Sequence, residues 1–352
     1  MKSGTISFAE FMHYALYAPD TGYYTSTTPK IGARGDFITA PEVSPIFNQC
    51  VATQCQQVIQ DVPDAVMVEI GAGLGTMAAD MLQYLQRAGC LPKHYYILEI
   101  SPWLRQQQKQ KLQQQVPDLL PLVSWIDKPL SQPFNGVIVG NEIIDALPVH
   151  RFKIEEGKIR ELGAACEQGQ FIEKMLDQTN PKLIERVQQI QANIGALPDG
   201  YCSEVLLDID LWLAQQTHSL QKGIVLLIDY GYAQKEYYAP YRNTGTLRCH
   251  YQHQAHDTPF IHVGEQDITA HVDFTALAET ALNQGLMISG YTTQAMFLAA
   301  CGFSEKAQDQ AYAVRRLTHP TLMGELFKAI AFGKNYDQSL MGFQFHDMKQ
   351  FL

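Results

Sequence analysis

The sequence predicts an α/β fold with a parallel sheet that helices cover on both faces. Short apolar runs typical of buried strands alternate with stretches typical of helices. One such run, at 66–70, leads through a glycine-rich turn directly into a helical stretch. The composition, with 46% hydrophobic and 18% charged residues among 352, is that of a globular protein large enough for a core domain with an insertion.

The first 150 residues contain most of the expected sheet. Residues 1–60 are rich in Gly, Pro and Tyr, and we expect a folded, loop-rich N-terminal lid or extension that ends in a helix at 45–60. Strands are expected at 66–70, 95–100, 121–125 and 136–140, with helices at 76–88 and 101–115. The glutamine-rich stretch 105–111 is expected to be only a solvent-exposed helix face.

The alternation stops near residue 150. Residues 152–162 are typical of a hairpin and residues 181–196 of an amphipathic helix, which predicts an insertion on the substrate side of the site. The sheet is expected to resume with a strand at 224–229, a helix at 274–284, and strands at 286–291 and 326–333. The expected segments are an extension at 1–60, a first part of the sheet domain at 61–150, an inserted subdomain at 151–203, and a second part at 204–352.

The turn after the first strand is the most informative motif. Glu69 is followed by three alternating glycines, Gly71, Gly73 and Gly75, directly before a helix. Glycines at such a turn let the backbone bend tightly and let a ligand approach closely. The dinucleotide fingerprint requires its third glycine one position later, where this chain has Thr76. A carboxylate beside the turn suits a cationic ligand better than a pyrophosphate.

A second acid, Glu99, ends the next strand-like run. In a parallel sheet it lies at the same edge as the glycine turn. S-adenosyl-L-methionine (SAM) carries an ammonium, a sulfonium and a ribose diol, which two acids can bind. The pattern therefore favours SAM over a nicotinamide cofactor, and a tight turn without any ligand is the remaining alternative.

A polar turn follows the expected fourth strand. Asn141 and Glu142 come directly after the buried run 136–140, and Asp145 shares their face if the turn is helical. Carboxylates at this place could hold an arginine guanidinium and polarise one nitrogen toward a methyl group. The alternative is that Glu142 and Asp145 only cap and solvate a loop.

Composition narrows the classes of partner and compartment. The net charge of -10 disfavours nucleic acid as a partner. Seven scattered cysteines without a C-x-x-C pair indicate neither a disulfide framework nor a zinc ribbon, and the histidines at 250–271 lack the spacing of a metal site, so none is expected. The amino terminus has no signal or transit pattern, and no apolar run reaches the roughly 20 residues of a membrane span. We therefore expect a soluble cytoplasmic protein.

Several of these stretches resemble a known family. Motifs at 35–42, 69–75, 98–102, 141–149, 228–231 and 264–274 are similar, in the same order, to those of the MidA-like SAM-dependent methyltransferases, which include a mitochondrial complex I assembly-factor arginine methyltransferase. The resemblance covers most of the chain and is more specific than a single glycine motif.

The resemblance implies a class I methyltransferase fold: a Rossmann-like sheet of seven strands, the last antiparallel, with SAM as the cofactor. It implies that Glu69, Gly71, Gly73 and Glu99 meet the methionine and ribose moieties and that Asp127 lies near the adenine. Further cofactor-binding positions in or beside the matching stretches are Gly35, Thr39, Gly75 and Asn141.

The leading functional hypothesis is methyl transfer from SAM to an arginine nitrogen of a protein, with Glu142 and Asp145 as catalytic residues. The acceptor would be a respiratory-complex subunit or another arginine-bearing protein. The alternatives are a SAM-binding assembly chaperone that transfers no methyl group and, less favoured, a nicotinamide-dependent oxidoreductase.

Overall fold

The computed structural model describes residues 4–26, 38–306 and 310–352. They form two compact units, and each unit collects segments that lie far apart in the sequence. The sheet unit comprises Ile38–Ile143, Leu211–Gly231 and Ala278–Leu352. The hairpin unit comprises the described part of Met1–Phe37 with Ile144–Asp210 and Tyr232–Leu277. The segment bounds expected at 60, 150 and 203 stay a prediction.

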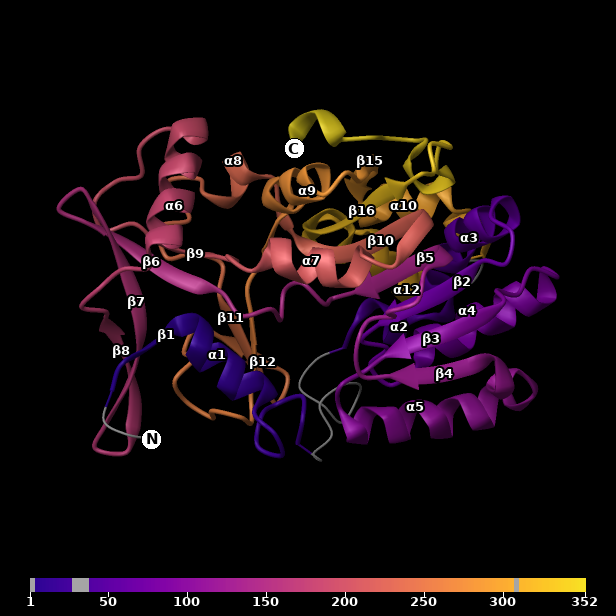
Figure 1. Cartoon of the computed structure of the whole chain (residues 1–352), viewed down its shortest axis with the longest axis horizontal. Coiled ribbons are helices and arrows are strands. Elements are labelled where there is room, and N and C mark those ends of the chain that lie inside the picture. The colour runs from indigo at the N-terminus through magenta and orange to yellow at the C-terminus, as the bar shows by residue number, and fades with distance from the viewer. Residues whose placement is uncertain (1–3, 27–37, 307–309) are drawn as a thin grey trace. The chain divides into compact units, whose positions relative to one another are not determined.

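The sheet unit is built on a mostly parallel sheet with the strand order β15-β16-β10-β5-β2-β3-β4 (Figure 1). Its strands are β2 (Val66–Ile70), β3 (His94–Leu98), β4 (Val123–Ile126), β5 (Phe134–Asn141), β10 (Leu220–Tyr232), β15 (Met287–Thr293) and β16 (Phe327–Lys334). Strands β4, β3, β2, β5 and β10 pair in parallel, whereas β16 is antiparallel to both β10 and β15. This is the predicted class I methyltransferase sheet, with its last strand antiparallel.

Helices pack against this sheet because the strands are apolar on both faces. In β2 and β5 most side chains are buried, as expected for strands in the middle of a parallel sheet. Helix α4 packs between α3 and α5. The helices that lie wholly in this unit are α2 (Ala40–Val43), α3 (Pro45–Asp61), α4 (Thr76–Arg87), α5 (Pro102–Gln115), α10 (Gln294–Ala300), α11 (Phe303–Lys306) and α12 (Ala311–Thr318). Short 3-10 or π turns lie at Pro117–Leu122, Pro320–Gly324, Met341–Phe343 and Lys349–Phe351.

The hairpin unit contains two antiparallel sheets. One has the order β1-β7-β6-β9, with β8 on β7, and the other has the order β12-β11-β13. The strands are β1 (Ile6–Ser7), β6 (His150–Glu155), β7 (Lys158–Glu167), β8 (Gln170–Met175), β9 (Cys202–Val205), β11 (Arg248–Tyr251), β12 (Gln254–His256) and β13 (Asp267–Thr269). The two-residue β14 (Val272–Asp273) is part of neither of these two sheets. Helices α1 (Phe8–Tyr17), α6 (Pro181–Ile194) and α8 (Gln234–Tyr237) belong to this unit, and α7 (Ile209–Thr217) and α9 (Phe274–Asn283) lie where the chain passes between units.

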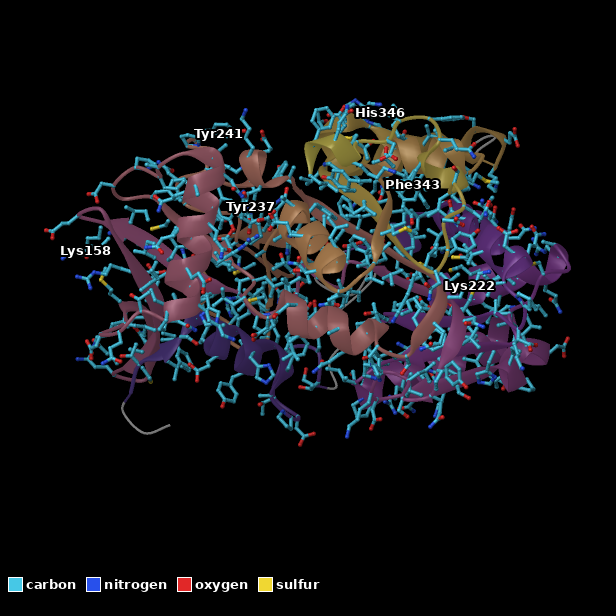
Figure 2. All side chains as sticks on the ribbon, turned by 45° about the horizontal axis from the view of Figure 1, so that its top comes forward. Lys158, Lys222, Tyr237, Tyr241, Phe343 and His346 are labelled. Atoms are coloured by element: carbon cyan, nitrogen blue, oxygen red, sulfur yellow. The ribbon has the colours of Figure 1, made fainter. Side chains whose placement is uncertain are left out.

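The predicted insertion after the fourth strand of the sheet is confirmed by the β6–β7 hairpin and by α6. Lys158, which opens β7 after the turn, lies at the outer edge of the hairpin (Figure 2). In the same unit Tyr237 is buried and Tyr241 is exposed, as their positions in Figure 2 also show. The buried face of α6 consists of Leu183, Val187 and Ile190, spaced as the amphipathic pattern requires.

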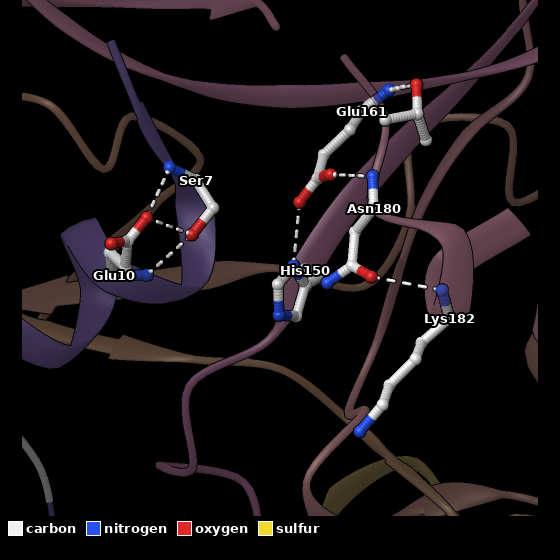
Figure 3. A network of polar contacts seen from close by, with 7 residues as sticks. Ser7, Glu10, His150, Glu161, Asn180 and Lys182 are labelled. Atoms are coloured by element: carbon white, nitrogen blue, oxygen red, sulfur yellow. Dashed lines mark hydrogen bonds and ion pairs between the residues drawn. The ribbon is translucent and has the colours of Figure 1, made fainter. Parts of the chain in front are cut away.

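Side-chain caps fix the starts of two helices in this unit (Figure 3). The Ser7 backbone N–H donates to Glu10 Oε2 at 3.0 Å, and the Glu10 N–H donates back to Ser7 Oγ at 3.2 Å, which is a reciprocal capping box. Asn180 Oδ1 caps α6 by accepting from the Lys182 N–H at 3.0 Å. The N-terminal extension contains helix as well as loop, as the predicted fold class has it: the capping box begins helix α1 at residue 8.

Candidate functional site

The glycine turn joins β2 to α4 in a backbone conformation that other residues rarely adopt. Gly71, Gly73 and Gly75 have φ values of +63°, +51° and +82°. A Cβ at position 71 would lie 2.3 Å from Ile143 Cδ1, so the turn also requires the absence of a side chain there. The Gly71 N–H donates to the carbonyl of Leu98 at 2.9 Å, which ties the turn to the end of β3.

Glu69 is a fully buried acid one residue before the end of β2. The Tyr95 hydroxyl donates to its Oε2 at 2.6 Å, and Oε1 has no hydrogen-bond partner within the described part of the chain. Burial raises the pKa of Glu69 to about 7; the Tyr95 hydrogen bond opposes this rise and the negative charge of Glu99 adds to it. A buried carboxylate oxygen normally has a hydrogen bond, so this atom is suited to accept one from a bound ligand.

Glu99 follows β3 and is 6% exposed. Its Oε1 accepts from the Ser101 N–H at 2.9 Å and its Oε2 from Gln108 Nε2 at 3.0 Å. Burial raises the pKa of Glu99, and these two hydrogen bonds oppose the rise. The Glu99 N–H donates to the carbonyl of Ile126 at 3.0 Å, and the exposed Asp127 comes next in the chain. The glycine turn, Glu99 and Asp127 thus lie at the carboxyl ends of three adjacent strands.

Gln108 connects these strand ends, although its stretch was expected to face solvent. Its side chain is fully buried, so that expectation is wrong at this position. Its Nε2 donates to the Gly73 carbonyl at 2.9 Å and to Glu99, while its Oε1 accepts from Trp125 Nε1 at 2.9 Å. The spacing Leu104, Gln108, Leu112 places all three on one helix face, and this i, i+4, i+8 signal could have indicated burial.

Asn141 is the last residue of β5 and Glu142 follows it directly. Asn141 Nδ2 donates to Glu142 Oε1 at 3.0 Å, and Asn141 Oδ1, although buried, has no partner among the described residues. Glu142 has φ +52°, unusual for a non-glycine residue, and its Oε1 also accepts from the Ala40 N–H at 3.3 Å. Thr39 precedes α2 and is therefore the chain neighbour of Ala40, which contacts Glu142. Gly35 lies outside the described residues.

Asp229, which lies near the end of β10 (Leu220–Tyr232), supports the segment after β5. Its Oδ2 accepts from the Ile143 N–H at 3.1 Å, and the Glu142 N–H donates to the carbonyl of Ile228 at 2.9 Å. Both bonds hold the segment after β5 against β10. Backbone strain at a residue fixed from several sides is typical of functional sites, which keeps Glu142 a candidate.

Asp145 does not share a helical face with Glu142. The turn is not helical, and Asp145 belongs to the hairpin unit, where it is 5% exposed. Its carbonyl accepts from the Ala270 N–H at 2.9 Å, and the Tyr17 hydroxyl donates to the carbonyl of Ala146 at 2.9 Å. Burial is the main reason why the pKa of Tyr24 is raised, and the charge of Asp267 comes next. Other neighbours, Asp145 among them, raise it further.

The other polar side chains of the described residues include no group placed as a metal site. Within residues 4–26, 38–306 and 310–352, no three His, Cys, Asp or Glu side chains are placed to hold a metal ion. Two of the clustered histidines stack on tyrosines instead, His262 on Tyr251 at 4.1 Å and His271 on Tyr232 at 5.3 Å between ring centroids. None of the helices in these ranges is both long and apolar enough to cross a membrane.

The residues at the strand ends fit SAM. The turn at Gly71 leaves no room for a side chain, and two buried acceptor atoms, Glu69 Oε1 and Asn141 Oδ1, lack a hydrogen-bond partner in the described structure. Two acids at neighbouring strand ends provide acceptors for an ammonium and for ribose hydroxyls. This set of acceptors therefore matches a cationic nucleoside better than a pyrophosphate.

Comparisons with known proteins agree with this chemistry. Residues 50–292 match the family described as S-adenosyl-L-methionine-dependent methyltransferase. A Burkholderia thailandensis protein crystallised with S-adenosyl-homocysteine has a TM-score of 0.93 and 36% identity, covering 99% of this chain and 93% of its own. A second structure from that organism has a TM-score of 0.90 and 35% identity, with 99% and 92% coverage.

More distant relatives carry a more specific name. The Drosophila melanogaster homolog of the mitochondrial protein arginine methyltransferase NDUFAF7 is 26% identical, over 94% of this chain and 82% of its own length. The Homo sapiens protein of that name is 26% identical, over 94% and 80%. The similarity to these relatives extends over both units of the chain.

Proposed function

Because this chain belongs to the family of S-adenosyl-L-methionine-dependent methyltransferases, we propose that its methyl acceptor is an arginine side chain of a protein. The observation that supports this acceptor most is the similarity, across 93–94% of the chain, to relatives named protein arginine methyltransferases. Acidic side chains beside the cofactor residues are the second support, since carboxylates bind guanidinium with good geometry.

The cofactor, when bound, supplies a methyl group that its sulfonium already activates. The chain then has to bind and align, which is the main source of rate in such a reaction. We propose that Glu69, Gly71, Gly73, Gly75 and Glu99 hold the methionine and ribose moieties, that Asp127 lies near the adenine, and that Thr39, Asn141 and the undescribed Gly35 complete the cofactor site.

Glu142 is the residue that we propose to hold the acceptor. Its Oε1 is fixed by Asn141 Nδ2 and the Ala40 N–H, so its carboxylate has a defined orientation. An arginine remains protonated at physiological pH, and a fixed carboxylate would orient its fork and polarise one nitrogen. Asp145, the other acid that the sequence predicts to be catalytic, stays a proposal from the sequence.

The alternative function is a chaperone that binds SAM and a partner protein but transfers no methyl group. Glu142, the acid after β5, would bind an arginine of a substrate in one case and a partner protein in the other, so it does not distinguish the two functions. A respiratory-complex subunit is a candidate acceptor or partner in both hypotheses. The named relatives are mitochondrial, and the cytoplasmic location expected for this chain is a proposal of its own.

The test uses purified protein, methyl-labelled SAM and extract from cells that lack the protein. We expect label on arginine residues of at least one protein, identified by mass spectrometry. Glu142→Gln should lower the rate of arginine labelling at least about tenfold, because it removes a charge-assisted hydrogen bond. It should keep the affinity for S-adenosyl-homocysteine.

The matched control is Glu156→Gln. Glu156 is also a glutamate with positive φ, +50°, but it is exposed in the turn between β6 and β7. Its replacement should leave labelling unchanged. Label on another residue type would contradict an arginine acceptor. A partner that co-purifies with both variants, with no label transferred by the unmodified protein, would favour the chaperone.

A further inference from the structure

We propose that Gln108 is a positioning residue that sets the specificity of the cofactor site for the ribose hydroxyls, acting through Glu99. This proposal rests on the cofactor of the family and not on the identity of the methyl acceptor. The observation behind it is that one buried side chain bonds to three elements, namely the glycine turn, the acid after β3 and strand β4.

The orientation of the Gln108 amide is determined by its partners. The Trp125 indole N–H can only donate, so it requires the amide oxygen. The Gly73 carbonyl and Glu99 Oε2 can only accept, at 2.9 and 3.0 Å, so they require the two amide hydrogens. A half-turn of the amide would place its NH2 group against the indole N–H of Trp125 and its oxygen against the two acceptor oxygens. All of the hydrogen-bonding groups of the amide are therefore satisfied in one orientation only.

This amide in turn fixes the carboxylate of Glu99. One carboxylate oxygen is held by the Ser101 N–H at 2.9 Å and the other by Gln108, so the plane of the group is set from both ends. A carboxylate has about four lone-pair sites, which leaves capacity to accept from a ligand hydroxyl. The Ser101 donor is backbone, so Gln108 is the side chain whose replacement frees the acid.

A fixed acid should discriminate strongly between ligands with and without a hydroxyl. A ligand that lacks the hydroxyl leaves the buried carboxylate with one hydrogen bond fewer, whereas an acid that can turn finds another partner. Loss of the Gln108 amide should therefore affect the ratio of affinities between such ligands more than it affects binding of the rest of the cofactor.

The experiment measures binding of S-adenosyl-homocysteine and of its 2′-deoxy and 3′-deoxy analogues by calorimetry. The unmodified protein should prefer the complete ribose over at least one analogue by about tenfold or more, as expected for hydrogen bonds to a charged group. Gln108→Met keeps the length of the side chain and removes its donors and acceptor. It should reduce this preference to within about threefold, by the same arithmetic.

Two further variants make the result specific. Gln110→Met makes the same replacement at an exposed position of α5 and should keep the full preference. Glu99→Gln should lose the preference by itself, and adding Gln108→Met to it should have little further effect, because both changes act on one interaction.

A measurement on the free protein separates positioning from general damage. The Trp125 indole N–H loses its acceptor in Gln108→Met, so the tryptophan emission should shift, and the shift should be absent in a Trp125→Phe background. If Gln108→Met does not fold, Trp125→Phe takes its place: it removes one of the three hydrogen bonds that hold the amide, so Glu99 is fixed less firmly and the preference should fall.

Equal weakening of all three ligands by Gln108→Met, or by Trp125→Phe where it replaces that variant, with an unchanged preference for the complete ribose, would overturn the proposal. In that case Gln108 would only pack between α5 and the sheet. This result is independent of whether arginine is the methyl acceptor, so failure of one proposal does not imply failure of the other.

Discussion

At the scale of single residues, Gly71 combines two constraints that can be separated by experiment. It has φ +63°, and its missing side chain leaves space that Ile143 Cδ1 occupies at 2.3 Å from an added Cβ. Gly89 has the same φ of +63°, but nothing lies within 4 Å of a Cβ there. The two positions therefore share the backbone penalty and differ in steric contact and in their distance from the cofactor residues along the chain.

We expect Gly89→Ala to lower the free energy of unfolding by about 1 kcal/mol, the cost of a left-handed residue with a side chain. Gly71→Ala should cost more than this and should also weaken the binding of S-adenosyl-homocysteine. Adding Ile143→Val, which removes the colliding methyl group, should recover part of both losses. Chemical denaturation and calorimetry measure the two effects. Equal losses in the two alanine variants would show that the contact with Ile143 is unimportant.

The buried acid Glu69 gives a prediction about pH. Its pKa rises from 4.5 to about 7 on folding, so between these values the folded state holds a proton that the unfolded state has released. Stability from this group therefore falls as pH rises from about 4.5 to about 7 and stays low above that pH. Glu69→Gln cannot titrate and should be free of this loss.

The difference in unfolding free energy between Glu69→Gln and the unmodified protein should grow from near zero at pH 4.5 to roughly 2–3 kcal/mol at pH 8, in favour of the variant. Denaturation at a series of pH values in the absence of ligand measures it. Taking the difference removes the other titrating acids from the comparison. A variant that is less stable at pH 8 would show that the charge of Glu69 is stabilised by a partner.

At the scale of elements, the strands of the parallel sheet could be predicted because each is a short apolar run beside a turn. The expected strands at 66–70 and 136–140 lie within one or two residues of β2 and β5. The helices at 45–60, 76–88 and 101–115 are equally close, since Ser101 and Pro102 mark the start of α5 in the sequence. Strong local signals therefore placed these elements.

The elements that were not predicted have weak or overlooked local signals. Strand β8 contains only exposed and partly buried residues, and β11 and β12 are very short, so local sequence gives little signal for any of the three. Helix α1 has a clear capping box at Ser7 and Glu10, and an interpretation based on its Gly- and Tyr-rich surroundings missed it. Gln108 was missed because glutamine usually faces solvent, although its position between two leucines on one helix face indicated otherwise.

At the scale of the whole molecule, the grouping of segments could not be read from the sequence. Residues 232–277 join the hairpin unit with 144–210, although a strand of the parallel sheet separates the two segments along the chain. Such grouping depends on contacts between residues far apart in sequence, for example the 2.9 Å bond from Tyr24 to Asp267 Oδ1. For the same reason the sequence placed Asp145 with Glu142, whereas the structure assigns the two acids to different units.

This division predicts how the cofactor product changes local stability. The described residues proposed for the cofactor all belong to the sheet unit, so S-adenosyl-homocysteine should slow hydrogen exchange mainly there, at 69–76 and 98–104. At 100 times its dissociation constant a ligand stabilises the binding-competent state by about 2.7 kcal/mol, which corresponds to roughly 100-fold slower exchange for amides that open only when the ligand leaves.

Amides of 144–210 that exchange by local opening should keep their rates. Exchange measured with and without ligand, and again in Gly71→Ala as the weakened binder, tests this; equal protection of 144–210 would mean that the hairpin unit itself takes part in holding the cofactor.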